Sequence, residues 1–295
     1  MRAPLGVVEI EYEVMGDDDG EPLLLIGGLG SQLISWDEEF CEELVARGYR
    51  VVRYDNRDSG LSTALDGYGV PDLLGLVMGR GQPPYLLDAL AEDAAALLRY
   101  IGVAQAHVIG LSLGGMVAQL LALAHPEMVL SVVAALSGPP GRPSALPAPD
   151  VVRALLRPPA ETFGERVEAA VALRQVLAVH EVGFDAALAS RRAELQIRRA
   201  YSPAATMRQA AAVLGTPNRL EDLHRLSVPV LFVHGELDPL VPLMSAQAAA
   251  AVIPRAELIT MPRLGHDLPA AVAMGLIDRI TDFHARHCDG KDGAA

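Results

Sequence analysis

The most informative stretch of this sequence is AHVIGLSLGG, residues 106–115, in which a β-branched run leads directly into a Gly-x-Ser-x-Gly pattern. It predicts a strand over 106–111 and a helix over 113–125, with Ser112 at the turn between them. This arrangement is typical of a nucleophile elbow, a strained turn in which small residues on either side of the serine avoid clashes with the neighbouring strand and helix. The alternative is a glycine-rich turn whose serine caps the helix.

Further strands and helices continue this pattern in both directions along the chain. The predicted strands are 7–14, 23–26, 50–54, 106–111, 130–136, 228–234 and 256–261, and the predicted helices are 36–47, 85–101 and 113–125. Strands that alternate with helices are typical of a doubly wound α/β sheet. The acidic loop at 16–20 is predicted to be a solvated hairpin turn between the first two strands.

The character of the sequence changes at Pro139, where a proline-rich linker begins and no clear strand follows until 228. The segment 139–223 holds eleven arginines against nine acidic residues, whereas the whole chain carries a net charge of −13. The simplest domain organisation is an α/β core made of residues 1–138 and 224–295, with a helical insertion over 139–223.

A serine hydroxyl is a poor nucleophile until a base accepts its proton, so a partner histidine is required. Among the eight histidines, His266 is the best placed, because it follows the predicted strand 256–261 and catalytic groups gather in loops at the carboxyl edge of such a sheet. The others are interpreted as structural, packed or solvated. His180 is assigned to the insertion, and His284 and His287 to a solvated C-terminal helix or tail.

The base needs an acidic residue that holds the imidazole in the correct tautomer. Asp238 is the candidate, because it follows a predicted strand and lies between the nucleophile and the base in the sequence. The order Ser112, Asp238, His266 is the order expected for this architecture. Glu236 is the competing acid, and Asp267 is a neighbour of the base.

Two further loops that contain glycine follow predicted strands. Acyl transfer requires N–H donors for the developing oxyanion, and the backbone N–H groups of Leu113 and of Leu29, in the loop GGLGS at 27–31, are the candidates. A phosphate-binding loop is disfavoured, because no Gly-Lys-Ser/Thr follows. The segment DNRDSG at 55–60 is interpreted as a structural turn in which a carboxylate or backbone carbonyls satisfy the charge of Arg57.

In combination these motifs resemble the α/β-hydrolase superfamily, and within it the capped serine esterases related to aclacinomycin methylesterase. The resemblance covers essentially the full chain and rests on GGL at 27–29, YDNRDSGLST at 54–63, the elbow around Ser112, DPLVP at 238–242, GHDLP at 265–269 and, in the insertion, RAYSP at 199–203 and RQ at 208–209. It implies an eight-stranded, mostly parallel sheet with a helical cap over Ser112. It also implies two-step acyl transfer that needs no metal and no organic cofactor.

Three functional hypotheses follow from this resemblance. The first is a serine hydrolase that cleaves a carboxylic ester (a methyl ester, another alkyl ester or a lactone) of a small apolar substrate. The second is a carbon–carbon bond hydrolase, thioesterase or cofactor-free perhydrolase on the same triad, and the third is a non-catalytic ligand-binding member of the fold. Serine at position 112 argues against epoxide hydrolase and haloalkane dehalogenase chemistry, which place an aspartate there. We expect the esterase.

The inner face of the insertion is expected to set substrate choice. Its aromatic residues Phe163, Phe184 and Tyr201, together with many aliphatic residues, suit an apolar acyl or alkyl group. One alternative is that the segment merely shields the core. Another is that Arg199 and Arg208 face the mouth of the site and attract an anionic substrate.

Composition limits the partners and the compartment. The 295 residues are 51% hydrophobic, which excludes a disordered chain, and the net charge of −13 disfavours nucleic acids and anionic membranes. The two cysteines, Cys41 and Cys288, are interpreted as free thiols in a reducing compartment. With no secretory signal expected at the N-terminus, the sequence predicts a cytoplasmic protein that acts on a small molecule, and it leaves a homodimer open.

Overall fold

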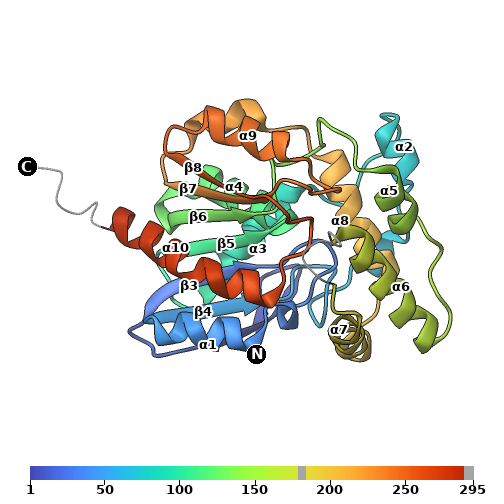
Figure 1. Cartoon of the computed structure of the whole chain (residues 1–295), viewed down its shortest axis with the longest axis horizontal. Helices are drawn as coiled ribbons and strands as arrows, with labels where there is room; N and C mark the ends of the chain where they lie inside the picture. The colour runs from blue at the N-terminus through green and yellow to red at the C-terminus, as the bar shows by residue number, and fades with distance from the viewer. Residues whose placement is uncertain (179–183, 289–295) are drawn as a thin grey trace, which may run out of the picture.

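The computed structural model describes residues 1–178 and 184–288, and within them eight strands form one sheet in the order β1-β2-β4-β3-β5-β6-β7-β8 (Figure 1). The strands are β1 (Arg2–Pro4), β2 (Glu9–Met15), β3 (Glu21–Ile26), β4 (Tyr49–Tyr54), β5 (Ala106–Leu111), β6 (Val129–Ala135), β7 (Val230–Gly235) and β8 (Ala256–Met261). β2 runs antiparallel to both of its neighbours, and the other pairs are parallel.

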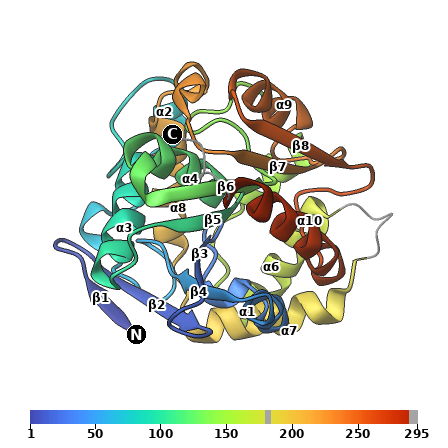
Figure 2. The same cartoon turned by 90° about the vertical axis from the view of Figure 1, so that its left-hand side faces the viewer.

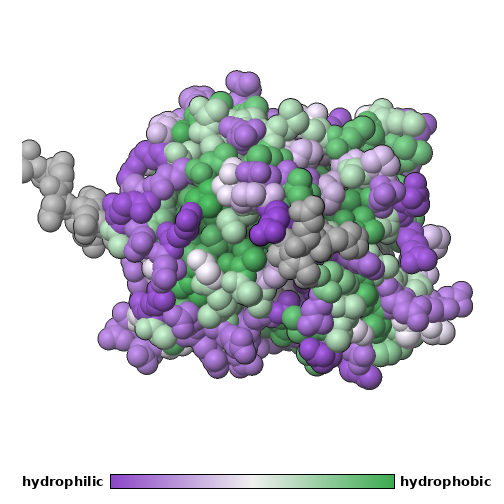
Figure 3. Space-filling model, in the orientation of Figure 1, coloured by the Kyte–Doolittle hydropathy of each residue, from purple (hydrophilic) through white to green (hydrophobic). Residues whose placement is uncertain are grey.

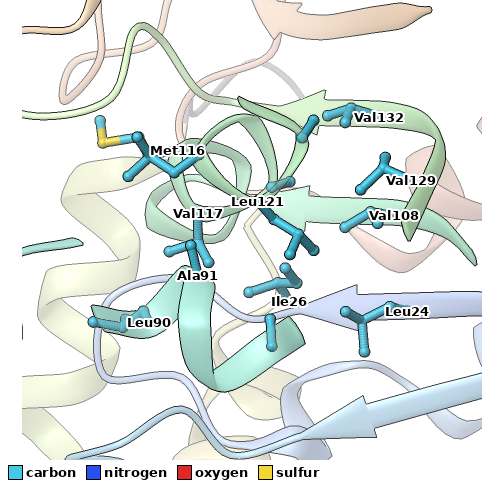
Figure 4. Packing of buried hydrophobic residues seen from close by; sticks show 14 of the residues in the cluster. Leu24, Ile26, Leu90, Ala91, Val108, Met116, Val117, Leu121, Val129 and Val132 are labelled. Atoms are coloured by element: carbon cyan, nitrogen blue, oxygen red, sulfur yellow. The ribbon is translucent and has the colours of Figure 1, made fainter. Parts of the chain in front are cut away.

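The central strands are apolar on both faces. On β3, Leu23 and Leu25 face one side of the sheet while Leu24 and Ile26 face the other, and all four are fully buried. Figure 4 shows the second side, where Leu24 and Ile26 pack with side chains of β5, β6 and the helix that follows β5. Such continuous apolar runs are what a parallel sheet covered on both faces requires.

Helices cover both faces of the sheet (Figure 2). α1 (Glu38–Ala46) and α10 (Ala270–Cys288) lie on one face, and α3 (Leu87–Tyr100), α4 (Leu113–Ala124) and α9 (Leu243–Val252) lie on the other. Crossovers between parallel strands are right-handed, so the face a helix covers depends on the direction in which the sheet grows. It grows from β3 to β4 through α1 and then in the opposite direction through α3, α4 and α9, which fixes the two layers.

The remaining helices lie beyond the carboxyl ends of the strands, on the right in Figure 1. They are α2 (Leu73–Val77), between β4 and α3, and the inserted helices α5 (Pro149–Leu155), α6 (Phe163–Leu177), α7 (Ala186–Arg199) and α8 (Pro203–Gly215), between β6 and β7. Leu74 and Val77 on α2 and Leu156 after α5 are exposed, and apolar surface is visible at the upper right in Figure 3. This end of the molecule is therefore less thoroughly packed than the sheet.

The α/β architecture is as predicted, but the predicted hairpin at 16–20 is wrong. β2 and β3 do not pair, because β4 lies between them: Met15 of β2 pairs with Val51, and Glu21 of β3 pairs with Tyr49. The three-residue edge strand β1 and the five-residue helix α2 were not predicted. Elements this short carry too little periodicity to be recognised from sequence.

The prediction that His284 is solvated is also wrong. Its ring is buried on the inner face of α10, stacks on His107 with centroids 4.0 Å apart, and accepts or donates a 2.8 Å hydrogen bond with the Tyr49 hydroxyl. Burial, together with the neighbouring His107, lowers the pKa of His284 to about 2. His180 lies outside the described residues. No helix in the described ranges is long and apolar enough to cross a membrane.

Candidate active site

Ser112 occupies a strained turn between β5 and α4. Its φ of 54° and ψ of −114° fall in a region that non-glycine residues rarely adopt. A Cβ on Gly110 would overlap the carbonyl oxygen of Gly114, and one on Gly114 would overlap that of Ile26. The two glycines of the motif are therefore required by the close approach of α4 to β3 and β5, which holds the turn in its strained conformation.

The structure brings Ser112, His266 and Asp238 together at the carboxyl edge of the sheet, after β5, β8 and β7. Ser112 Oγ lies 2.9 Å from His266 Nε2, and His266 Nδ1 lies 2.7 Å from Asp238 Oδ2. An aspartate carboxylate only accepts hydrogen bonds, so Nδ1 carries the proton and Nε2 is left as the acceptor for the serine hydroxyl. The other oxygen, Oδ1, accepts from the backbone N–H groups of Leu240 and Val241 at 2.9 and 2.8 Å.

The competing acidic residues lie elsewhere. Glu236 is exposed, whereas Asp238 is buried. Asp267 forms an ion pair of 3.3 Å with Arg174 of α6. A residue that the sequence left as merely packed, His234, is buried beside Asp238 and donates from Nε2 to the carbonyl of Val241 at 2.8 Å. Burial lowers the pKa of His234, so its ring is neutral and does not compete for the carboxylate.

The two predicted oxyanion donors flank the serine. Leu113 is the first residue of α4, where backbone N–H groups have no partner inside the helix. Leu29 lies in the turn after β3, which approaches so closely that a Cβ on Gly28 would contact Ser112 Cβ at 3.5 Å. Across residues 1–178 and 184–288, neither the Leu29 nor the Leu113 N–H has a hydrogen-bond acceptor. Both are available to a negative charge that develops beside Ser112.

A cavity of about 300 Å³ opens over Ser112 and His266. The inserted helices contribute mainly aliphatic side chains to its wall: Leu155, Ala170, Leu173, Leu177, Ala189 and Ala193. Two ion pairs between these helices and the core also line it, Arg174 with Asp267 and Arg192 with Asp37. In the part of the chain that the structure describes, no group of three or more histidine, cysteine, aspartate or glutamate side chains is placed to hold a metal ion.

The aromatic residues of the insertion do not line this cavity. Arg198 lies over the ring of Phe163 and Arg166 over that of Tyr201, each 4.4 Å from the ring centroid, while Phe184 is half-buried outside the cavity. These rings therefore do not form the inner face: Phe163 of α6 stacks with Arg198 of α7, and Tyr201, after α7, stacks with Arg166 of α6. The apolar wall is aliphatic instead.

Neither Arg199 nor Arg208 faces the mouth of the site. Arg199 donates to Asp55 at 2.7 Å, and the fully buried Arg208 makes hydrogen bonds of 2.7 to 3.1 Å to Asp58. Attraction of an anionic substrate by these two side chains is therefore ruled out. Asp55 and Asp58, the buried carboxylates that bind them, belong to the 55–60 loop, and Arg208 also pairs with the exposed Asp66 at 2.8 Å. The sequence carried no signal for these pairs.

The 55–60 loop is a structural turn, as predicted. Arg57 forms a two-pronged ion pair with Asp93 of α3, at 2.6 and 2.7 Å. Asp55 accepts from the N–H groups of Leu33 and Leu61 as well as from Arg199. Burial nevertheless raises the pKa of Asp55. The loop thus connects the core, the loop after β3 and the inserted helices.

Comparison with known proteins agrees with this geometry. A family model described as the alpha/beta hydrolase fold matches residues 21–269. Rhodomycin D methylesterase DnrP of Streptomyces peucetius is 35% identical over 284 residues, which cover 90% of this chain and 91% of that protein. Its counterpart DauP of Streptomyces sp. strain C5 is 34% identical over 288 residues, with the same coverage. The solved structure of 2-hydroxy-6-oxo-6-phenylhexa-2,4-dienoate hydrolase from a Rhodococcus strain is similar in fold alone, with a TM-score of 0.73, 23% identity and 97% of both chains covered. The chain described here belongs to the α/β-hydrolase fold family.

Proposed function

We propose that this protein is a serine hydrolase that cleaves a carboxylic ester of a small apolar molecule. Ser112 is the nucleophile, His266 the general base and acid, and Asp238 the residue that orients the imidazole. The observation that carries the proposal is the continuous chain of hydrogen bonds from Ser112 Oγ through His266 to Asp238, at 2.9 and 2.7 Å, on the floor of an apolar cavity. The full-length similarity to two methylesterases supports ester cleavage over the other chemistries of the fold.

In the first step, Ser112 Oγ attacks the ester carbonyl while His266 Nε2 accepts its proton. The carbonyl oxygen becomes negatively charged and is stabilised by the N–H groups of Leu29 and Leu113, which are fixed before the substrate arrives. Asp238 stabilises the imidazolium that forms. The tetrahedral intermediate collapses, His266 returns the proton to the leaving alkoxide, and the alcohol departs from an acyl-enzyme on Ser112.

In the second step, a water molecule takes the place of the alcohol. His266 accepts a proton from this water as it attacks the acyl carbonyl, and the same two N–H groups hold the second oxyanion. Collapse returns the proton from His266 to Ser112 Oγ and releases the carboxylic acid. Each half-reaction uses the same base and the same donors, so one rigid constellation serves both.

The cavity and the relatives together favour a methyl or other small alkyl ester. A volume of about 300 Å³ lies at the lower end of small-molecule sites, and its aliphatic walls suit an apolar acyl group. We assign substrate choice to a cap formed by residues 139–223, inserted in a core of residues 1–138 and 224–295. The helices α5, α6 and α7 of that segment supply the aliphatic lining.

We also propose that the enzyme is cytoplasmic and acts on a small molecule. Burial raises the pKa of the free thiol of Cys41 to about 11, so this cysteine is unreactive and suited to a reducing compartment. The net charge of −13 supports a partner that is neither a nucleic acid nor an anionic membrane.

The test is a panel of p-nitrophenyl esters of increasing acyl length, followed by methyl, ethyl and isopropyl esters of the preferred acid. We expect hydrolysis of the activated esters and a preference for the methyl ester. Thioesters, vinylogous diketones and peracid formation from acetate and hydrogen peroxide form the second arm. Faster turnover in that arm than with any ester identifies the sibling chemistry, and no turnover with any substrate identifies a binding protein.

Ser112→Ala should lower kcat by roughly 10⁴–10⁶-fold while leaving the melting temperature close to that of the wild type, because only the nucleophile is removed. A fluorophosphonate adduct should map to Ser112 by mass spectrometry. An adduct on another serine contradicts the assignment.

Asp238→Asn should lower kcat by about 10⁴-fold through the wrong imidazole tautomer, by analogy with the protease triad. Glu236→Gln is the matched control, because Glu236 lies two residues away and is exposed. If the control proves the more damaging of the two, the orienting acid has been misassigned.

A further inference from the structure

We infer that Gln209, on the inserted helix α8, is a positioning residue for the oxyanion donor Leu29. This inference rests on the proposed function, because it concerns how one of the two N–H donors is held. It gives the insertion a part in transition-state stabilisation, beyond covering the site. Three segments that are far apart in the sequence meet here: the loop after β3, the 55–60 loop and α8.

Gln209 is fully buried and uses both ends of its side-chain amide. Its Oε1 accepts a 2.8 Å hydrogen bond from the backbone N–H of Gly30, and its Nε2 donates a 2.7 Å bond to the backbone carbonyl of Arg57. These contacts join residues 179 and 152 positions apart. The single side chain therefore ties the loop that carries Leu29 to the 55–60 loop of the core.

The tie acts on the peptide group next to the donor. Gly30 N–H belongs to the peptide unit that follows Leu29, so fixing this unit limits rotation about the Leu29 backbone and thereby the direction of the Leu29 N–H. Gly30 itself has a φ of 67°, in the region that favours glycine. A Cβ at this position would lie 3.0 Å from the Thr206 side chain on α8, which shows how closely the helix packs on the loop.

The other bonds of the loop do not replace this one. The Asn56 side chain donates to the Gly27 carbonyl at 3.2 Å, and Ser59 Oγ donates to the Ser31 carbonyl. Both hold the ends of the turn and both engage carbonyl oxygens. The backbone closes the turn through a 3.1 Å bond from the Ser31 N–H to the Gly28 carbonyl, and Gln209 is the side chain that binds the Gly30 N–H at its centre.

Small displacements at this point are costly for catalysis. An oxyanion donor acts when it lies about 2.7–3.1 Å from the developing charge. A misplacement of about 1 Å can lower the rate by about 100-fold. Loss of the Gln209 bond should therefore reduce kcat far more than KM, because the carbonyl oxygen is held tightly in the transition state and loosely in the substrate complex.

The experiment compares Gln209→Met with wild-type protein in the hydrolysis of p-nitrophenyl butyrate, with active sites counted by a fluorophosphonate. Methionine keeps the volume and loses both hydrogen bonds. We expect kcat per active site to fall by about 10- to 100-fold, with KM changed by no more than about twofold. The inhibition constant of a trifluoromethyl ketone, whose adduct with Ser112 bears an oxyanion, should rise by the same factor.

Two variants separate positioning from simple loss of packing. Gln209→Glu keeps an acceptor that faces Gly30 and should keep more of kcat than Gln209→Met. Thr216→Val is the matched control: Thr216 is fully buried directly after α8 and its hydroxyl accepts from the Leu87 N–H of α3 at 2.9 Å, far from the loop after β3. It should lower the melting temperature and leave kcat per active site unchanged.

Gln209→Asn, whose side chain is one methylene shorter and is drawn back from Gly30, gives the same comparison if the methionine variant does not fold. A kcat per active site within about threefold of wild type overturns the inference, as does a fall in kcat with no loss of trifluoromethyl ketone affinity. Absence of ester hydrolysis in the wild-type protein contradicts the proposed function instead, so the two failures are distinguishable.

Discussion

Helix α8 and the helix pair α6–α7 belong to the same inserted segment, yet they meet the core in different ways. On α8, Arg208 and Gln209 are fully buried and bind Asp58 and the backbone of the neighbouring loops. On α6 and most of α7, the contacts to the core include the partly exposed ion pairs of Arg174 with Asp267 and Arg192 with Asp37. Only the last residue of α7, Arg199, reaches a buried carboxylate, that of Asp55. The insertion is therefore divided into a part built into the active-site framework and a part that rests on it.

The difference is large in energetic terms. Breaking a buried ion pair by removing one partner costs about 3–5 kcal/mol, because a charge is left without compensation in a place that water does not reach. A solvent-exposed pair contributes about 0.2–1 kcal/mol. The cavity-lining parts of α6 and α7 can thus change in sequence at small cost to folding, whereas α8 and Arg199 at the end of α7 cannot.

The most direct test makes the same Asp→Asn substitution at the core partner of α8, Asp58, and at the core partner of α7, Asp37. Asp58→Asn should lower the free energy of unfolding by up to about 3 kcal/mol, since it removes the buried carboxylate of Arg208 and leaves that side chain only the exposed Asp66. Asparagine tolerates the left-handed φ of 61° at this position, so backbone strain does not add to the effect. Asp37→Asn should cost less than about 1 kcal/mol. Urea unfolding at pH 7 measures both, and equal losses would remove the distinction between the two helices.

The pH dependence of the free energy of unfolding tests a third site, the buried histidine pair His107 and His284, which lies outside the insertion. Burial lowers the pKa of His107 and lowers that of His284 to about 2, so folding favours their neutral forms. The unfolded chain binds protons below about pH 6.5 and the folded chain does not. Stability should therefore be fully present above that pH and fall as the pH drops through it, by up to about 1.4 kcal/mol per pH unit for each ring.

His284→Gln removes one of the two titrating rings and should flatten this decline. Urea unfolding between pH 7.5 and 5 measures the slope. An unchanged slope in His284→Gln shows that other groups dominate the pH dependence.

Exchange of segments with a related esterase has the smallest expected effect on folding. Replacing 149–195, which contains α5, α6 and most of α7 and leaves Arg199 on the buried Asp55, should change the ester preference by about 10-fold and retain kcat for the best substrate, since a pocket contact is worth about 1–3 kcal/mol. Replacing 139–223 with a segment that lacks the side chains of Arg208 and Gln209 should also lower kcat. If the smaller exchange folds and keeps the parent's preference, these helices do not select the substrate.

Local patterns in the sequence were sufficient for strands β2 to β8, the elbow and the triad. Ser112, Asp238 and His266 were identified because each follows a predicted strand, and parallel strands bring their carboxyl ends to one edge. The contacts of the insertion gave no such signal. Arg208 and Asp58 are 150 residues apart. The sequence left open whether Arg208 faces the mouth of the site, because neither hydrophobic period nor motif spacing reports which charge a side chain meets.

The buried histidine on α10 was missed for a different reason. Leu276, Ile277, Ile280 and Phe283 recur at helical spacing, and His284 follows the last of them on the same apolar face. The helical periodicity therefore places His284 on the apolar face, although a polar residue near the end of a helix is usually solvated. The predicted hairpin between β2 and β3 failed for yet another reason. β4 lies between these strands, and strand order depends on crossover direction rather than on loop composition.

The sequence by itself therefore determined the α/β class, the serine turn and the three side chains, Ser112, Asp238 and His266, that meet at the edge of the sheet. Each of these is encoded within a few residues, by side-chain period, by glycines that permit close approach, and by the position of a polar residue after a strand. The tertiary structure alone decided which helices line the cavity, which arginines are buried, and how the loop of Leu29 is held from behind. Those features depend on contacts between residues far apart in the sequence, which form only when the whole chain folds. A local sequence pattern does not indicate which distant partner will satisfy a buried charge or amide.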